Sequence, residues 1–180
     1  MDLLASILNA QRGGAVRELA GSLGLDEGQA GAAITALLPA LTQGLKRNTT
    51  SPGGLESLMG ALTGGGHQRY LDNPETLARP ETTADGNAIL GHLLGSKEVS
   101  RQVAGRAAQQ TGLDVGVLKQ ALPLVAALVM GTMSRHTAQQ RATAPGGSPG
   151  DLMGSLSSLL DGNQDGSIAD DLMGFAKKLF

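Results

Sequence analysis

Cysteine is absent from this 180-residue chain, and aromatic residues are nearly so. Without cysteine the chain can form no disulfide, no thiolate metal site and no cysteine nucleophile. Its only aromatic residues are Tyr70, Phe175 and Phe180, too few for a surface on which nucleic-acid bases stack. Charged residues make up 17% of the chain and the net charge is −2, which predicts no strongly basic surface. We therefore expect no nucleic-acid partner.

The chain also lacks an uninterrupted apolar run and a basic N-terminus. Its most apolar window, residues 118–133, contains Lys119, Gln120 and Pro123, and it falls short of the roughly 20 residues that span a bilayer. Asp2 stands where a secretion signal carries basic residues. These features predict a soluble, cytoplasmic protein with no membrane span.

Glycine, with 27 residues, is abundant beside alanine and leucine, whereas the β-branched and aromatic residues that favour strands are few. Two apolar stripes recur at helical spacing and predict long core helices. Each helix contains a proline, Pro39 or Pro123, which predicts a kink or a split. The stripes are Ile34, Leu37, Leu41 and Leu45 in the first helix, and Leu118, Leu122, Val125, Val129 and Met133 in the second.

Several short motifs occur twice in the same order. Gly24-Leu25-Asp26 returns as Gly112-Leu113-Asp114, and each copy precedes one of the proline-containing helices. Asp26 and Asp114 are suited to cap those helices, and Gln29 completes a capping box in the first copy. Ser51-Pro52-Gly53 likewise returns as Ser148-Pro149-Gly150, where serine should cap a helix that begins at the proline. These matches predict a tandem duplication, although chance similarity among Ala/Gly/Leu-rich helices is the alternative.

The predicted architecture is all-α, with about eight or nine helices in two tandem related halves that form one compact globule. Residues 1–70 form the first helical repeat, 71–85 the connector, and 86–180 the second repeat with a C-terminal acidic loop and helix. The sequence around the connector, residues 63–85, contains Gly64-Gly65-Gly66, Pro74 and Pro80, which indicates an irregular link.

With these motifs assembled, the chain resembles a family of uncharacterised bacterial proteins, domain of unknown function 937. The resemblance rests on residues 85–96 (DGNAILGHLLGS) and their continuation to Val103, on Gly112-Leu113-Asp114, on the helix from Leu122-Pro123 to Gly131, and on the acidic loop before residues 170–174. It implies an all-helical bacterial protein, and it implies no particular activity.

The acidic segment near the C-terminus has the spacing of a calcium loop. Alternating oxygen ligands, a glycine at the sharp turn and Ile168 match the first eight positions of an EF-hand, but position 12 is Leu172 instead of an acid. We expect Asp171 to close the site and the affinity for Ca²⁺ to be weak, on the order of 10⁻⁵–10⁻³ M. The alternative is a surface turn followed by acids that favour a helix N-terminus. The predicted ligands are Asp161, Asn163, Asp165, the Ser167 carbonyl and Asp171.

No catalytic constellation accompanies this loop. His67, His92 and His136 lie in different segments, and His92 is suited to be a hydrogen-bonded core residue. Gly91 and Gly95 have a small-xxx-small spacing that suits close core packing or a homo-oligomer seam. The leading hypothesis is a non-enzymatic structural or protein-interaction module, which binds a protein partner or itself. The alternative is an enzyme or small-ligand-binding protein with a pocket between the two halves.

Overall fold

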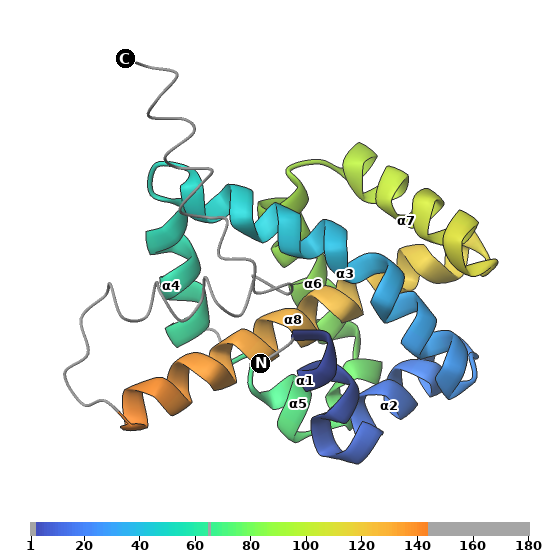
Figure 1. The fold of residues 1–180 in the computed structure, drawn as a ribbon, viewed down its shortest axis with the longest axis horizontal. Helices are drawn as coiled ribbons and strands as arrows, with labels where there is room; N and C mark the ends of the chain where they lie inside the picture. Colours follow the sequence, from blue (N-terminus) through green and yellow to red (C-terminus); the bar gives the residue numbers. More distant parts are fainter. Residues whose placement is uncertain (1–2, 65, 144–180) are drawn as a thin grey trace.

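The computed structural model describes residues 3–64 and 66–143, and every regular element in this part of the chain is a helix, without a strand (Figure 1). The fold class predicted from the sequence is confirmed. The elements are α1 (Leu3–Asn9), η1 (Ala10–Gly13), α2 (Gly14–Leu23), α3 (Glu27–Thr50), α4 (Gly54–Gly64), α5 (Arg69–Asp72), η2 (Pro74–Ala78), α6 (Pro80–Leu94), α7 (Lys97–Thr111) and α8 (Val115–Thr143), where η marks a 3₁₀ segment.

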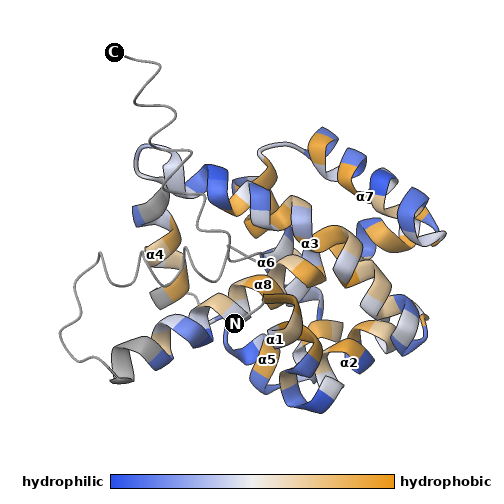
Figure 2. Cartoon of the chain, viewed as in Figure 1, coloured by the Kyte–Doolittle hydropathy of each residue, from blue (hydrophilic) through white to orange (hydrophobic). Residues whose placement is uncertain are grey.

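Helix α8 is the centre of the fold: each of the seven other α-helices in the described residues contacts it, and Figure 1 shows them arranged around it. Every residue from Ala121 to Ser134 is buried. The apolar surface is wider than the predicted stripe, since Leu124, Ala127 and Leu128, which lie outside the stripe, are buried as well. A helix that is apolar on all sides is stable only when it is enclosed. Figure 2 shows the apolar residues gathered along α8 and on the inner faces of its neighbours.

The same helix is the one segment of the described chain that is long and apolar enough to cross a membrane, over Val115–Gln139. Core helices of soluble proteins pass this composition test as well, and 72% of the apolar window is buried inside the fold. The surrounding helices therefore bury most of this apolar window.

Both proline-containing helices begin as the sequence predicts. The Asp26 carboxylate accepts a hydrogen bond of 2.7 Å from the Gln29 backbone N–H, and the Gln29 side chain accepts one of 3.1 Å from the Asp26 N–H. Asp114 accepts a bond of 2.7 Å from the Gly116 N–H. Each cap follows a left-handed glycine, Gly24 or Gly112, that ends the preceding helix. These matching boundaries are what a tandem duplication would produce, and the duplication itself stays a prediction.

α3 and α8 continue through Pro39 and Pro123, so neither helix is split, and the kink, the other predicted outcome, stays a prediction. Two other local predictions differ from the structure. Helix α4 begins at Gly54, because Ser51 ends α3 and Gly53 adopts a positive φ of 73°. The segment 63–85 is not irregular: it holds the end of α4, α5, η2 and the start of α6. Pro74 and Pro80 occupy first-turn positions, where proline starts a helix instead of breaking it.

Two glycines let α6 contact its neighbours at backbone distance. At Gly86 an added Cβ would lie 2.1 Å from the Pro123 carbonyl oxygen of α8. At Gly44 of α3 it would lie 2.5 Å from the Leu93 carbonyl oxygen of α6. The three helices α3, α6 and α8 are therefore held closer together than any side chain at these positions would allow, and this packing explains part of the glycine content.

Candidate interaction groove

A large hollow in the described part of the chain is a groove between α3 and α7. Residues 35–47 of α3 form one wall, residues 99–110 of α7 form the other, and Leu3 and Leu4 of α1 and Leu94 of α6 complete the lining. Its volume is about 1050 Å³. At 1.5 Å per residue the α3 wall is roughly 18 Å long, which corresponds to about three turns of a helix. Figure 1 shows α7 lying alongside α3 on the outside of the molecule.

The floor of the groove is apolar. Leu4, Ala36, Val99 and Val103 are partly buried and pack against the hydrophobic core, so each keeps some apolar surface in contact with solvent. Beneath them Leu38, Leu94 and Ala107 are buried. Covering such a floor with another apolar surface is favourable by roughly 25 cal/mol for each Å² removed from water.

The rim of the groove is cationic. Lys46, Arg47 and Arg106 are exposed along it, and the side-chain amides of Gln43, Gln102 and Gln110 stand among them. No aspartate or glutamate is among the described residues that line the groove. None of the three cations belongs to any ion pair formed between described residues, which join Arg17–Glu27, Arg69–Asp85, Arg101–Glu98 and Arg135–Asp72.

Pro39 lies on the α3 wall. It is exposed within the groove and has no N–H, so it cannot form the regular helical bond to the carbonyl of Thr35, which also lines the groove. The groove as a whole offers an apolar floor and three positive charges.

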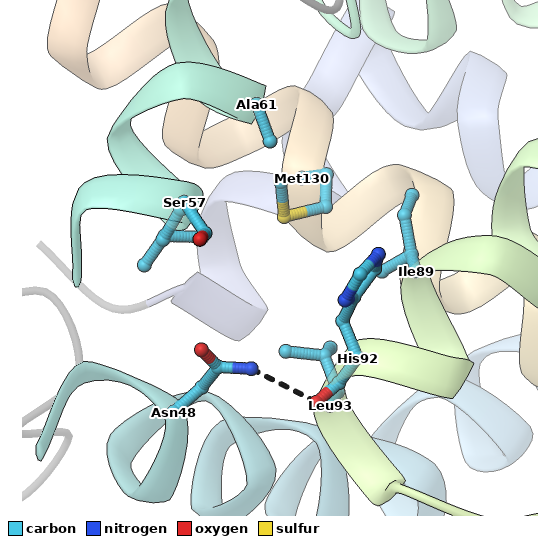
Figure 3. Close-up of a pocket in the computed structure, with 8 residues that line it drawn as sticks. Asn48, Ser57, Ala61, Ile89, His92, Leu93 and Met130 are labelled. Atoms are coloured by element: carbon cyan, nitrogen blue, oxygen red, sulfur yellow. Dashed lines mark hydrogen bonds between the residues drawn. The ribbon is translucent and has the colours of Figure 1, made fainter. Parts of the chain in front are cut away.

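A second, much smaller hollow lies between the two predicted halves of the chain. Its volume is about 100 Å³, well below the roughly 300–1000 Å³ of typical ligand pockets. Two of its polar groups already have partners. Asn48 Nδ2 donates to the His92 carbonyl at 2.9 Å (Figure 3), and Ser57 Oγ donates to the Gly53 carbonyl at 3.0 Å. The lining residues are Asn48, Ser57, Leu58, Ala61, Ile89, His92, Leu93 and Met130.

A cluster of three polar side chains, Arg69, Tyr70 and Asp85, joins α5 to α6. The buried Tyr70 hydroxyl donates to the Asp85 carboxylate, and Arg69 Nη2 donates to the same oxygen at 2.6 Å. The Arg69 guanidinium also stands over the Tyr70 ring, 4.9 Å from its centroid. Burial, together with the hydrogen bond to Asp85, raises the pKa of Tyr70. This cluster satisfies a buried hydroxyl, and its role is to fix α5 against α6.

His67 lies beside this cluster, with its ring 6.0 Å from that of Tyr70. Its Nδ1 atom is buried and has no hydrogen-bond partner among the described residues. Burial lowers the pKa of His67, although the nearby Asp85 carboxylate opposes the shift. His67 therefore favours its neutral form in the folded protein.

The predicted calcium ligands Asp161, Asn163, Asp165, Ser167 and Asp171 lie outside the described residues. Among the described residues no group of three or more His, Asp or Glu side chains is arranged to hold a metal ion.

Two predictions for α6 are wrong. His92 is exposed instead of interior, since it faces the small hollow at the surface. Gly91 and Gly95 are exposed, and no neighbouring atom lies within 4 Å of an added Cβ at either position, so they form no close core contact. The homo-oligomer seam, the alternative for these two glycines, stays a prediction. The glycines that do allow close approach, Gly44 and Gly86, have no spacing that marks them in the sequence.

Sequence reasoning also missed the groove. Its walls come from residues about 60 positions apart, and only the exposed Lys46-Arg47 pair marks it in the sequence.

Comparison with known proteins places the chain in one family. No curated protein and no solved structure matches it. One family model, described as a bacterial protein of unknown function (DUF937), matches residues 5–136, which include both walls of the groove and most of α8. Because this match covers well over half of the chain, the protein belongs to the DUF937 family of bacterial proteins.

Proposed function

We propose that this chain is a non-enzymatic protein-interaction module of the bacterial cytoplasm, which binds an amphipathic helical segment with acidic residues in the groove between α3 and α7. The observation that carries the proposal is the lining of the groove. An apolar floor suits the apolar face of a helix. Three cations that form no ion pair with another described residue, with no acid among the described residues that line the groove, suit acidic residues at the edges of that face.

The dimensions of the groove agree with this occupant. A wall of roughly 18 Å accepts about three helical turns, so apolar residues at positions i, i+4 and i+8 of a partner can all reach the floor. The exposed cations each contribute little alone, about 0.2–1 kcal/mol, but three acting on one partner give roughly 1–2 kcal/mol. That difference corresponds to about a 5- to 30-fold change in affinity.

The alternative function, an enzyme or small-ligand binder, would use the hollow between the halves. That hollow is about 100 Å³, and the Asn48 and Ser57 side chains that line it hydrogen-bond to backbone carbonyls of the protein itself. Its size and its occupied polar groups favour the interaction module as the proposal.

The test uses two synthetic amphipathic peptides with the same apolar positions, one carrying glutamate and the other lysine at the remaining positions. Fluorescence anisotropy with the full chain should show binding of the acidic peptide only. A Lys46→Glu/Arg47→Glu/Arg106→Glu variant should bind the acidic peptide about 5- to 30-fold more weakly.

The matched control is Arg79→Glu/Lys97→Glu/Lys119→Glu, which changes the net charge equally at exposed positions outside the groove. This control should keep the affinity within about twofold. Equal binding of both peptides, or equal losses in both variants, would refute the proposed groove.

A further inference from the structure

The groove has a suitable partner in the sequence of this protein itself, and this inference rests on the proposed function. Residues 151–171, named here the acidic segment, lie outside the described residues and contain five aspartates and no lysine or arginine. Residues 1–150 contain twelve basic and eleven acidic residues and are therefore nearly neutral. The described residues that line the groove include three cations and no acid. The acidic segment and the groove are thus complementary in charge.

The start of the acidic segment has the apolar pattern of an amphipathic helix. Ser148-Pro149-Gly150 precedes it as Ser51-Pro52-Gly53 precedes α4, and α4 begins directly after that motif, at Gly54. The same offset predicts a helix that begins at Asp151. Leucines at relative positions i, i+4, i+7 and i+8 would then share one face of this helix. They are Leu152, Leu156, Leu159 and Leu160.

This predicted helix also fits the length of the groove. Leu152 and Leu160 are eight residues apart, about 12 Å along a helix, and the α3 wall is roughly 18 Å long. The leucines can therefore all lie on the apolar floor. Asp151 and Asp161 stand at the two ends of the leucine stretch, where the cations of the rim can pair with them.

The position of Thr143 favours a second molecule as the source of the segment. Helix α8 ends at Thr143, on the opposite side of the molecule from α7 (Figure 1). Three residues connect α7 to the start of α8, and the 29 residues of α8 extend about 43 Å from that turn. Seven residues separate Thr143 from Asp151, and even fully extended they reach only about 25 Å. The groove of a neighbouring molecule is not subject to this limit.

We propose that the acidic segment of one molecule binds as a helix in the α3–α7 groove of a second copy. Each molecule carries one groove and, on the opposite side, the end of α8 from which its segment continues. The contact is therefore head-to-tail instead of symmetric, and its repetition adds further copies to an open chain of molecules. Acidic helices from other proteins compete with the segment for the same groove.

Sedimentation velocity on two complementary variants tests this contact. Lys46→Glu/Arg47→Glu/Arg106→Glu reverses the charge of the groove and keeps the segment. Leu152→Ser/Leu156→Ser/Leu160→Ser disrupts the segment and keeps the groove. The unmodified protein should associate beyond a dimer as its concentration rises roughly a hundredfold to about 1 mM, because a single small contact is weak.

Each variant alone should associate at least about fivefold more weakly than the unmodified protein. Their equimolar mixture should form a heterodimer with the affinity of the unmodified contact, because the mixture contains one intact segment and one intact groove. A heterodimer also shows that both variants are folded, since each must supply its intact half.

Two variants serve as matched controls. Arg79→Glu/Lys97→Glu/Lys119→Glu changes the charge outside the groove, and Ser155→Asn/Ser157→Asn/Ser158→Asn changes the segment but keeps its leucines. Both should associate as the unmodified protein does. A labelled synthetic peptide of residues 151–171 gives a second measurement that needs no variant, and its anisotropy should show saturable binding to the unmodified protein.

The acidic amphipathic peptide used above separates this proposal from the proposed function. If that peptide binds while the mixture forms no heterodimer and the 151–171 peptide does not bind, the segment is not the partner, and the groove remains an interaction site. If neither peptide binds, the proposed function fails as well.

Three further outcomes would overturn the contact between copies. Binding of the 151–171 peptide without a heterodimer in the mixture would mean that the segment fills the groove of its own molecule. Full association of either variant alone would place the self-contact on another surface. A dimer that grows no further would overturn the head-to-tail arrangement.

Discussion

Gly86 and Gly91 lie five residues apart in α6, and replacing each by alanine should have opposite effects on stability. In a helix interior alanine is favoured over glycine by about 1 kcal/mol. Gly91 is exposed, with no atom within 4 Å of an added Cβ, so Gly91→Ala should stabilise the protein by roughly 0.5–1 kcal/mol.

At Gly86 the same Cβ would lie 2.1 Å from the Pro123 carbonyl oxygen and 2.6 Å from its carbon. These are backbone atoms of the central helix, which cannot move aside as a flexible side chain would. Forced separation of packed elements costs typically 1–3 kcal/mol, and it must be larger here than the helix-propensity gain. We expect Gly86→Ala to destabilise the protein by about 2 kcal/mol net.

Thermal unfolding followed by circular dichroism measures both variants. For a chain of this length 1 kcal/mol changes Tm by about 2–4 °C. Gly86→Ala should therefore lower Tm by roughly 4–8 °C, and Gly91→Ala should raise it by a few degrees. A Gly86→Ala variant as stable as the unmodified protein would refute the close approach of α6 to α8.

Three further predictions concern polar groups. Tyr70→Phe should destabilise the protein by about 1–2 kcal/mol in denaturant unfolding, because it removes a buried hydroxyl from the Asp85 carboxylate and leaves that charge with fewer donors; an unchanged unfolding midpoint would contradict the cluster. Because burial lowers the pKa of His67, the unfolded chain takes up a proton on this residue at a higher pH than the folded chain does. Stability should thus decrease as pH falls through about 6.5 and level off below the folded pKa; His67→Gln should reduce this slope in unfolding curves measured from pH 8 to 5, and an identical slope would count against the buried neutral imidazole. Millimolar Ca²⁺ should raise Tm relative to EDTA, because a ligand at 100 times its Kd adds about 2.7 kcal/mol to the free energy of unfolding. The rise in Tm should vanish in Asp161→Ala/Asp165→Ala, and no rise in either protein would contradict the predicted calcium site.

The elements that could be predicted from the sequence are those whose signals are local. The capping box at Asp26 involves residues three apart, and the buried stripes of α3 and α8 recur every turn, so propensity and spacing were sufficient. Helix boundaries near proline could not be predicted in this way, because a proline can either end one helix or begin the next. Pro74 and Pro80 each begin a helical segment, and the packing of the following turn decides between these two outcomes.

The candidate site could not be predicted, because it depends on contacts between distant residues. Lys46 and Arg106 share one rim only after α3 and α7 have packed around the core. Tyr70 and Asp85 are fifteen residues apart and meet through the turn formed by α5 and η2. Gly86 and Gly91 have similar neighbours in the sequence, and only the tertiary packing determines which of them contacts Pro123.

The central claim is that a partner helix binds in the α3–α7 groove, and a fluorophore placed there tests it most directly. Since the chain has no cysteine, Gln102→Cys allows a single label at the rim, and Ala78→Cys allows one at an exposed residue that does not line the groove. Titration of the full chain with the acidic amphipathic peptide should give a saturable fluorescence change at position 102 and none at position 78. A flat response at both positions, or an equal response at position 78, would contradict the proposed site.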